Sequence, residues 1–375
     1  MLNEITGRAQ ADFNTTNNVG QPNQGATGKL IGKAVVEVIT PQSILQDAME
    51  EISFNFNKSD DYALKSRKER NRTDGSMKER LKAFRKVAGE NAADPKGEAE
   101  KLARAIEERP EREAILKEAM EHHEEPAEAW AALEEARDLL KQKGADPAVL
   151  KEMDEALALM DMRYGAAIRA GITGALTAAQ DYVSLGSPLD LGATYRKAVL
   201  EFTSTLSLYS YVQDKFGGDF DKAVDFLYAS LAGDMECDAP SADRAALESV
   251  NTSFGKLRSF QSAHAQCNTQ MRRWDDVHHV HDSGMKGLDL LGKVLNMGSQ
   301  SFIGASDAED VARAAKAPDL ERRILFLQEL QQSIRSFSPQ VFDNTEGRAR
   351  VLDAVQEAVD KAVTEEDALL SSQED

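Results

Sequence analysis

The chain has 375 residues, more than one hydrophobic core normally serves, so we expect two or three domains. Hydrophobic residues make up 41% and aromatic residues only 6%, and the abundance of Ala, Glu and Leu favours helix. The net charge of −19 disfavours nucleic acid or anionic lipid as a partner of the whole protein.

The compartment is indicated by three absences in the sequence. Two cysteines do not make a disulfide framework, which favours a reducing compartment. The N-terminus has no basic start followed by an apolar core, and no stretch approaches the roughly 18 apolar residues of a membrane span. We therefore expect a cytoplasmic protein without a Sec-type signal peptide or a membrane span.

The N-terminal part changes composition near residue 30. Residues 1–29 are rich in Asn, Gln, Thr and Gly, and they offer too little apolar surface to offset the entropy of ordering, so we expect disorder. AVVEVIT at 34–40 and ISFNF at 52–56 are the best strand candidates. Two short strands cannot form a stable sheet alone, so we expect them to pair with something else or to be local extended pieces.

Residues 65–86 are basic, with ten Lys or Arg against three acidic residues. The segment is either a solvated helix face or a docking patch for an acidic partner, with Lys65, Arg67, Lys68, Arg70 and Arg72 as its candidate residues. Nucleic-acid binding is disfavoured because aromatic and glycine residues do not regularly interleave with the charges, Gly75 and Phe84 being the two in the segment.

The rest of the chain has helical periodicity. Asp146 is predicted as an N-cap with Pro147 at the first helical position. One apolar stripe, followed by FGGD at 216–219, predicts a single helix; it consists of Tyr195, Val199, Phe202, Leu206 and Tyr209. The acidic stretch 234–243 is predicted to be a linker. We predict an all-α fold with helical domains at 65–147, 148–240 and 241–375.

A glycine-rich stretch at 162–182 contains Gly165, Gly171 and Gly174. Their spacing matches neither GxGxxG nor GxxxxGK[ST], so a phosphate-binding loop is disfavoured. A bend or a tight helix crossing explains the small residues without a ligand. We predict a helix break or bend between Gly165 and Gly174.

Candidate chemistry is confined to two small clusters. His278 and His281 share a helical face that Asp275 or Asp282 could join, but the pattern is neither HExxH nor a paired-cysteine site. Cys267 lies three residues from His264, a common helical spacing that comes without an evident oxyanion donor. We find no convincing catalytic set, and a helical metal-binding enzyme using His278 and His281 is the alternative to an interaction protein.

Two stretches resemble the type III secretion gatekeeper family. DAMEEISFNFNKSDDYALKSRKERNR at 47–72 resembles the family's opening signature, and residues 322–367 resemble its TyeA-like C-terminal domain, here fused in the same chain. YGAAIRAGI at 164–172 resembles a segment near the start of the middle domain. The resemblance implies an elongated rod of three helical bundles and a protein that acts by docking, with no enzyme activity and no cofactor.

The resemblance also implies partners and a place of action. Gatekeepers bind the export gate on the cytoplasmic side of the injectisome, hold back effectors and favour translocator export until host contact, and many are then exported themselves. Residues 1–29 would be a non-cleaved secretion signal and 30–64 a segment that binds a type III chaperone, with translocator–chaperone complexes as further partners. The residues that the chaperone would cover are Val35, Val36, Val38, Ile39, Ile52, Phe54 and Phe56.

Overall fold

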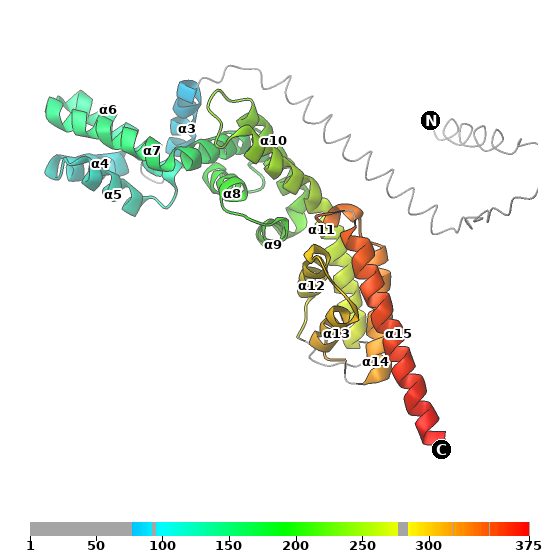
Figure 1. Cartoon of the computed structure of the whole chain (residues 1–375). Helices are drawn as coiled ribbons and strands as arrows, with labels where there is room; N and C mark the ends of the chain where they lie inside the picture. Colours follow the sequence, from blue (N-terminus) through cyan, green and yellow to red (C-terminus); the bar gives the residue numbers. More distant parts are fainter. Residues whose placement is uncertain (1–76, 92–94, 277–283, 318, 345, 375) are drawn as a thin grey trace, which may run out of the picture. The chain divides into compact units, whose positions relative to one another are not determined.

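The computed structural model describes residues 77–91, 95–276, 284–317, 319–344 and 346–374 (Figure 1). Over these residues the chain is built of helices joined by turns, without a β-strand, so the predicted all-α fold is confirmed. Within the same ranges, no helix combines the length and the apolar character needed to cross a membrane. The strand candidates at 34–40 and 52–56 and the candidate patch at 65–72 lie outside the described residues.

Five helices share the first hydrophobic core. They are α3 (Met77–Asn91), α4 (Pro95–Glu108), α5 (Arg112–His122), α6 (Pro126–Lys143) and α7 (Pro147–Thr177). Their apolar stripes meet around fully buried side chains such as Phe84, Leu133 and Met160. Burial of such side chains is the main favourable term that holds short helices like α4 and α5 in place.

The remaining helices share the second core. They are α8 (Pro188–Leu200), α9 (Thr205–Phe216), α10 (Phe220–Met235), α11 (Arg244–Asp276), α12 (Gly287–Ser299), α13 (Ala305–Ala314), α14 (Leu320–Arg335) and α15 (Gly347–Glu374), with short helical turns η2 (Gly217–Asp219) and η3 (Pro339–Val341). Trp274 on α11 is fully buried against Phe326 of α14, and its indole N–H donates to the Ala315 carbonyl at 3.0 Å. In Figure 1, α15 runs beside α14, with which it packs.

Helix α7 contributes to both cores. Its residues Ile168 and Ile172 belong to the first core, whereas Ala170 belongs to the second. The helix packs against α3, α5, α6, α8 and α10. A single 31-residue helix therefore joins the two cores, and the division into three domains stays a prediction.

Several helix ends follow from local sequence signals. The carboxylate of Asp146 accepts a 2.8 Å hydrogen bond from the Ala148 N–H, and Pro147 occupies the first turn, as predicted. Ser187 and Pro188 begin α8 in the same way. Gly144 ends α6 with φ of 71°, a left-handed conformation that glycine adopts without strain.

The predicted single helix through the 195–209 stripe is wrong. The structure ends α8 at Leu200 and begins α9 at Thr205, where the Ser204 hydroxyl accepts the Ser207 N–H at 3.1 Å. The apolar period continues through residues 201–204, so it conceals the turn. Because Ser204 is a strong N-cap residue, it provides the start of α9 that the hydrophobic pattern masks.

Of the predicted break or bend between Gly165 and Gly174, the break is wrong, because α7 continues through both glycines and only at Ala178–Tyr182 widens into a π-helical turn, η1. The bend stays a prediction. The tight crossing is confirmed. A Cβ at Gly174 would lie 2.7 Å from that of Tyr195, and one at Gly192 would lie 2.6 Å from the Gly171 carbonyl oxygen. The glycines let α7 and α8 approach closely, and packing across the crossing keeps the helix intact.

Candidate functional site

A cavity of about 430 Å³ opens at the turn between α8 and α9. The turn supplies Phe202 and Ser204, the start of α9 supplies Leu206, and the opposite walls come from α11, α12 and the residues around η3. The unpredicted helix break therefore creates the recess, because a continuous helix would not turn its side chains toward α11 and α12.

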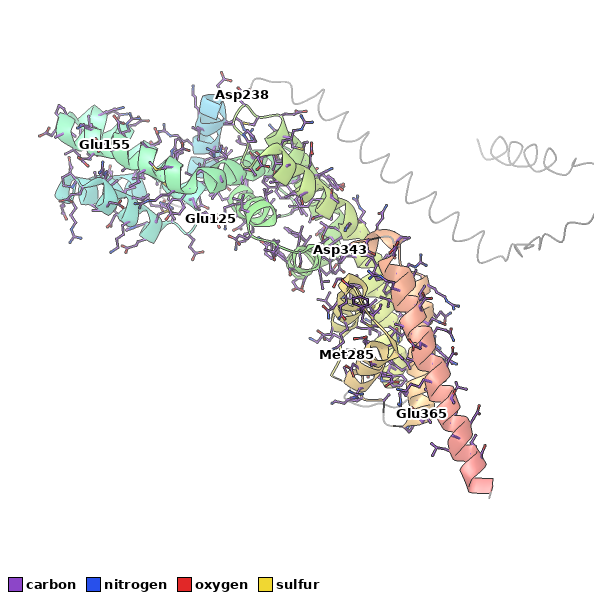
Figure 2. The ribbon with its side chains drawn as sticks, viewed as in Figure 1. Glu125, Glu155, Asp238, Met285, Asp343 and Glu365 are labelled. Carbon is purple, nitrogen blue, oxygen red and sulfur yellow. The ribbon has the colours of Figure 1, made fainter. Side chains whose placement is uncertain are left out.

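The wall of this cavity is a mixture of apolar side chains and small hydroxyl groups. Val250, Phe260, Leu295 and Phe342 line it beside Ser249, Ser253, Ser299 and Asn296. Asp343, labelled in Figure 2 near the start of α15, is the charged side chain among the described lining residues, and its carboxylate lies 3.3 Å from the Lys256 Nζ. Such a wall offers apolar packing and hydrogen-bonding groups to a bound partner.

A buried polar network joins α8 to the end of α10. The phenolic O–H of Tyr195 donates to the Asp234 carboxylate at 2.9 Å, and the Ser241 backbone N–H donates to the other oxygen at 2.8 Å. The Ser241 hydroxyl donates to the same carboxylate. Burial, followed by the charge of Asp234, raises the pKa of Tyr195 well above its usual value of 10, so the phenol keeps its proton and acts as a donor.

Arginines from two other helices fix the surroundings of this network. Arg80 of α3 donates to the Thr173 hydroxyl at 2.6 Å and to the Gly233 carbonyl at 3.2 Å. Arg169 of α7 donates to the Pro240 carbonyl at 3.1 Å. The predicted linker at 234–243 does connect α10 to α11, but its first residue is fully buried and its turn is tied to α7, so it is a packed turn rather than a solvated linker.

Cys267 and His264 do not act together as a nucleophile and its base. Cys267 is fully buried, and burial raises the pKa of its thiol to about 12. His264 instead lies with its Nδ1 2.7 Å from the Tyr209 hydroxyl oxygen, and burial lowers its pKa. A protonated, enclosed thiol is inert, so this cluster is part of the core.

The metal-binding alternative finds no support in the structure. Residues 277–283, which include His278, His281 and Asp282, lie outside the described residues. Across the ranges that the structure does describe, no group of three or more His, Cys, Asp or Glu side chains could hold a metal ion.

In comparisons with known proteins, the chain matches two family models. The model of the HrpJ-like domain matches residues 45–216, and the TyeA model matches residues 288–368. The first match contains the signature at 47–72 and the second contains the stretch at 322–367, so both resemblances are confirmed. The chain belongs to the type III secretion gatekeeper family. In this gatekeeper the cavity lies between the two matched regions, because Phe202 belongs to the first and Leu295 to the second.

Three solved structures align with this chain, and the fold agrees with that of the first. Methylated MxiC of Shigella flexneri aligns with a TM-score of 0.50 at 17% identity, covering 72% of this gatekeeper and 94% of MxiC. CopN of Chlamydia pneumoniae aligns with a TM-score of 0.47 at 17% identity, covering 74% of this chain and 99% of CopN. A CopN-Scc3 complex gives a TM-score of 0.46 at 18% identity, with coverages of 74% and 99%.

The functional features predicted from the sequence are not the ones that the structure describes. The candidate chaperone-binding residues and the basic patch, all before residue 77, lie outside the described residues and stay predictions. Sequence analysis missed the cavity and the buried Asp234. For the cavity, Ser204 at the start of a new apolar stretch was the available signal. Asp234 lies in the acidic stretch 234–243, and nothing in that sequence distinguishes the one buried acidic residue from the others.

Proposed function

We propose that this type III secretion regulator is a gatekeeper that docks at the cytoplasmic face of the export gate. There it blocks early effector secretion and promotes translocator export until host contact. The protein works in the bacterial cytoplasm at the base of the injectisome and leaves the cell through the same secretion system. Its action is docking alone, without catalysis or cofactor.

One observation carries this proposal. A single chain contains both an HrpJ-like region and a TyeA region, and the two together span about two thirds of its length. The families matched are secretion regulators rather than enzymes.

The N-terminal part has two proposed tasks. Residues 1–29 act as the uncleaved export signal. Residues 30–64 bind a type III chaperone through the apolar residues of the two strand candidates. Two short strands do not form a stable sheet alone, and strand addition to a partner would satisfy their backbone groups. The basic segment beginning at Lys65 is a further docking surface, for an acidic partner.

Chaperone binding can be tested with purified proteins. In the full chain, Phe54→Asp together with Phe56→Asp should abolish co-purification with the type III chaperone of the same secretion system. Phe13→Asp, an apolar residue of the N-terminal tail, is the matched control and should leave the complex intact. Loss of thermal stability in the double variant without its chaperone would instead make residues 52–56 part of the folded core.

The gatekeeper role itself is tested by secretion from a strain that lacks this protein. The proposal predicts effector proteins in the medium before host contact and a reduced amount of translocator. A strain whose effector and translocator release matched wild type would contradict it.

A further inference from the structure

Phe302 is held out in solvent by a turn that joins α12 to α13. Its side chain is 93% exposed, the largest exposed fraction among the large hydrophobic residues that the structure describes. Folding gains nothing from a phenylalanine in that position, whereas burying it against a partner would remove its ring from water. Exposed aromatic side chains of this kind are frequent anchors of protein–protein interfaces.

The turn is anchored from α15 by a single arginine. The Arg350 guanidinium donates to the carbonyl oxygens of Gln300 at 2.8 Å, Ser301 at 3.3 Å and Gly298 at 3.2 Å. Three bonds to successive parts of one turn restrict the backbone on the N-terminal side of Phe302. The guanidinium acts here as a clamp on the loop.

The C-terminal side of the turn is anchored as well. The Gly304 N–H donates to the Asp307 carboxylate at 2.9 Å, and the Ala305 N–H donates to the Glu357 carboxylate of α15 at 3.3 Å. Ile303, next to Phe302, packs against the second core. Because both sides of the turn are held, the backbone at Phe302 has little freedom left to lose on binding.

Acidic side chains lie on the two helices that hold the turn. On α15, Asp353 and Glu357 are exposed and lie one turn apart, and Glu357 contacts the turn itself. Asp310 on α13 is exposed too, but its carboxylate pairs with the Arg313 guanidinium at 2.7 Å, so it adds little net charge. The charge of Arg350, by contrast, is directed into the backbone carbonyls of the turn. A partner that accepts the ring would therefore be favoured by basic side chains around its pocket.

From this geometry we infer that Phe302, with the acidic face of α15 beside it, docks into an apolar, phenylalanine-sized pocket rimmed by Lys or Arg on another protein. The inference rests on the proposed function, which supplies that protein: the export-gate component at which the gatekeeper docks. It assigns the contact to the TyeA region of the chain, since residues 300–304, 353 and 357 all lie within 288–368.

The test measures binding of the full chain to the purified cytoplasmic domain of the export-gate protein from the same secretion system. Phe302→Ser should weaken binding about tenfold or more, the loss typical of an aromatic anchor. Met162→Ser is the matched control: Met162 is 79% exposed on α7, so its replacement should leave affinity unchanged. Asp353→Lys should weaken binding several-fold and reduce its dependence on salt. Both serine variants should melt as wild type does, because neither side chain is packed.

The possible results distinguish a failure of the Phe302 contact from a failure of the proposed docking at the export gate. A wild-type chain that does not bind the export-gate domain overturns the proposed docking, and the inferred contact with it. A wild-type chain that binds, with Phe302→Ser binding equally well, overturns the inferred contact alone. Sedimentation that shows a dimer of wild type and a monomer of Phe302→Ser would make the occupant a second copy of this chain, and would also overturn it.

Discussion

The phenol of Tyr195 on α8 donates a 2.9 Å hydrogen bond to the carboxylate of Asp234 at the end of α10. Both side chains are fully buried, and the α10–α11 turn closes over them through Ser241. The bond fixes α8 at the point where it crosses α7. It therefore ties α8 to α10 beside α7, the helix that joins the two cores.

Removing this bond should lower stability. Tyr195→Phe leaves the buried carboxylate with one donor fewer, and a hydrogen bond to a charged group is worth about 1.5–3 kcal/mol. Denaturant unfolding measures the free energy of unfolding. The matched control is Tyr211→Phe, whose hydroxyl lies 3.5 Å from the Thr194 hydroxyl oxygen and should contribute less than about 0.5 kcal/mol. Equal losses in the two variants would contradict a special role for the buried pair.

The crossing of α7 and α8 should reject a methyl group. In Gly192→Ala the new Cβ would lie 2.6 Å from the Gly171 carbonyl oxygen, so backbone must move, at a cost of about 1–3 kcal/mol. Gly89→Ala, in α3, is the control with the opposite sign: no atom lies within 4 Å, and the change should stabilise the helix by about 0.5–1 kcal/mol. The melting temperatures of both variants, compared with that of the wild type, test these two expected changes in stability. Stabilisation by Gly192→Ala would show that the two helices do not cross this closely.

The two cysteines should differ sharply in reactivity. Cys267 is fully buried and burial raises its pKa to about 12, whereas Cys237 is partly exposed. Iodoacetamide at pH 8 should therefore modify Cys237 in the folded chain and reach Cys267 only after denaturation. Peptide mass spectrometry locates the label. Rapid alkylation of native Cys267 would reopen its interpretation as a nucleophile.

Acid should weaken the fold partly through His264. Burial lowers the pKa of His264 below the ordinary value of 6.5, so the unfolded state binds its proton more readily. The stabilisation by the neutral ring is complete above pH 6.5 and is lost as pH falls through the folded-state pKa. His264→Gln should flatten the fall in unfolding free energy between pH 7 and pH 5. An unchanged slope would assign the acid sensitivity to other groups.

Local signals predicted the parts of the fold that local forces decide. Asp146 and Pro147 identify the start of α7 because capping and proline geometry act within one turn of the chain. The absence of strands among the described residues follows from a composition rich in helix formers. Helical periodicity predicts helices but not the family to which they belong. The TyeA region was predicted from the family resemblance at 322–367.

Features decided by tertiary packing were not predictable. The glycines from 165 to 174 weaken an isolated helix, yet packing against α8 keeps α7 continuous. Apolar residues such as Phe202 and Leu206 maintain the helical period across the turn that separates α8 from α9, so the cavity had no signature of its own. Asp234 resembles its acidic neighbours in sequence, and only the approach of Tyr195 from another helix sets it apart.

As the proposed gatekeeper, this chain would set the order in which effectors and translocators are secreted. The most direct measurement is the ratio of effector to translocator protein in the medium before host contact, compared between a deletion strain and the same strain carrying the full chain on a plasmid. We predict a high ratio in the deletion strain, from premature effector release and reduced translocator export, and a return to the wild-type ratio on complementation. A ratio that is the same in wild-type, deletion and complemented strains would contradict the account.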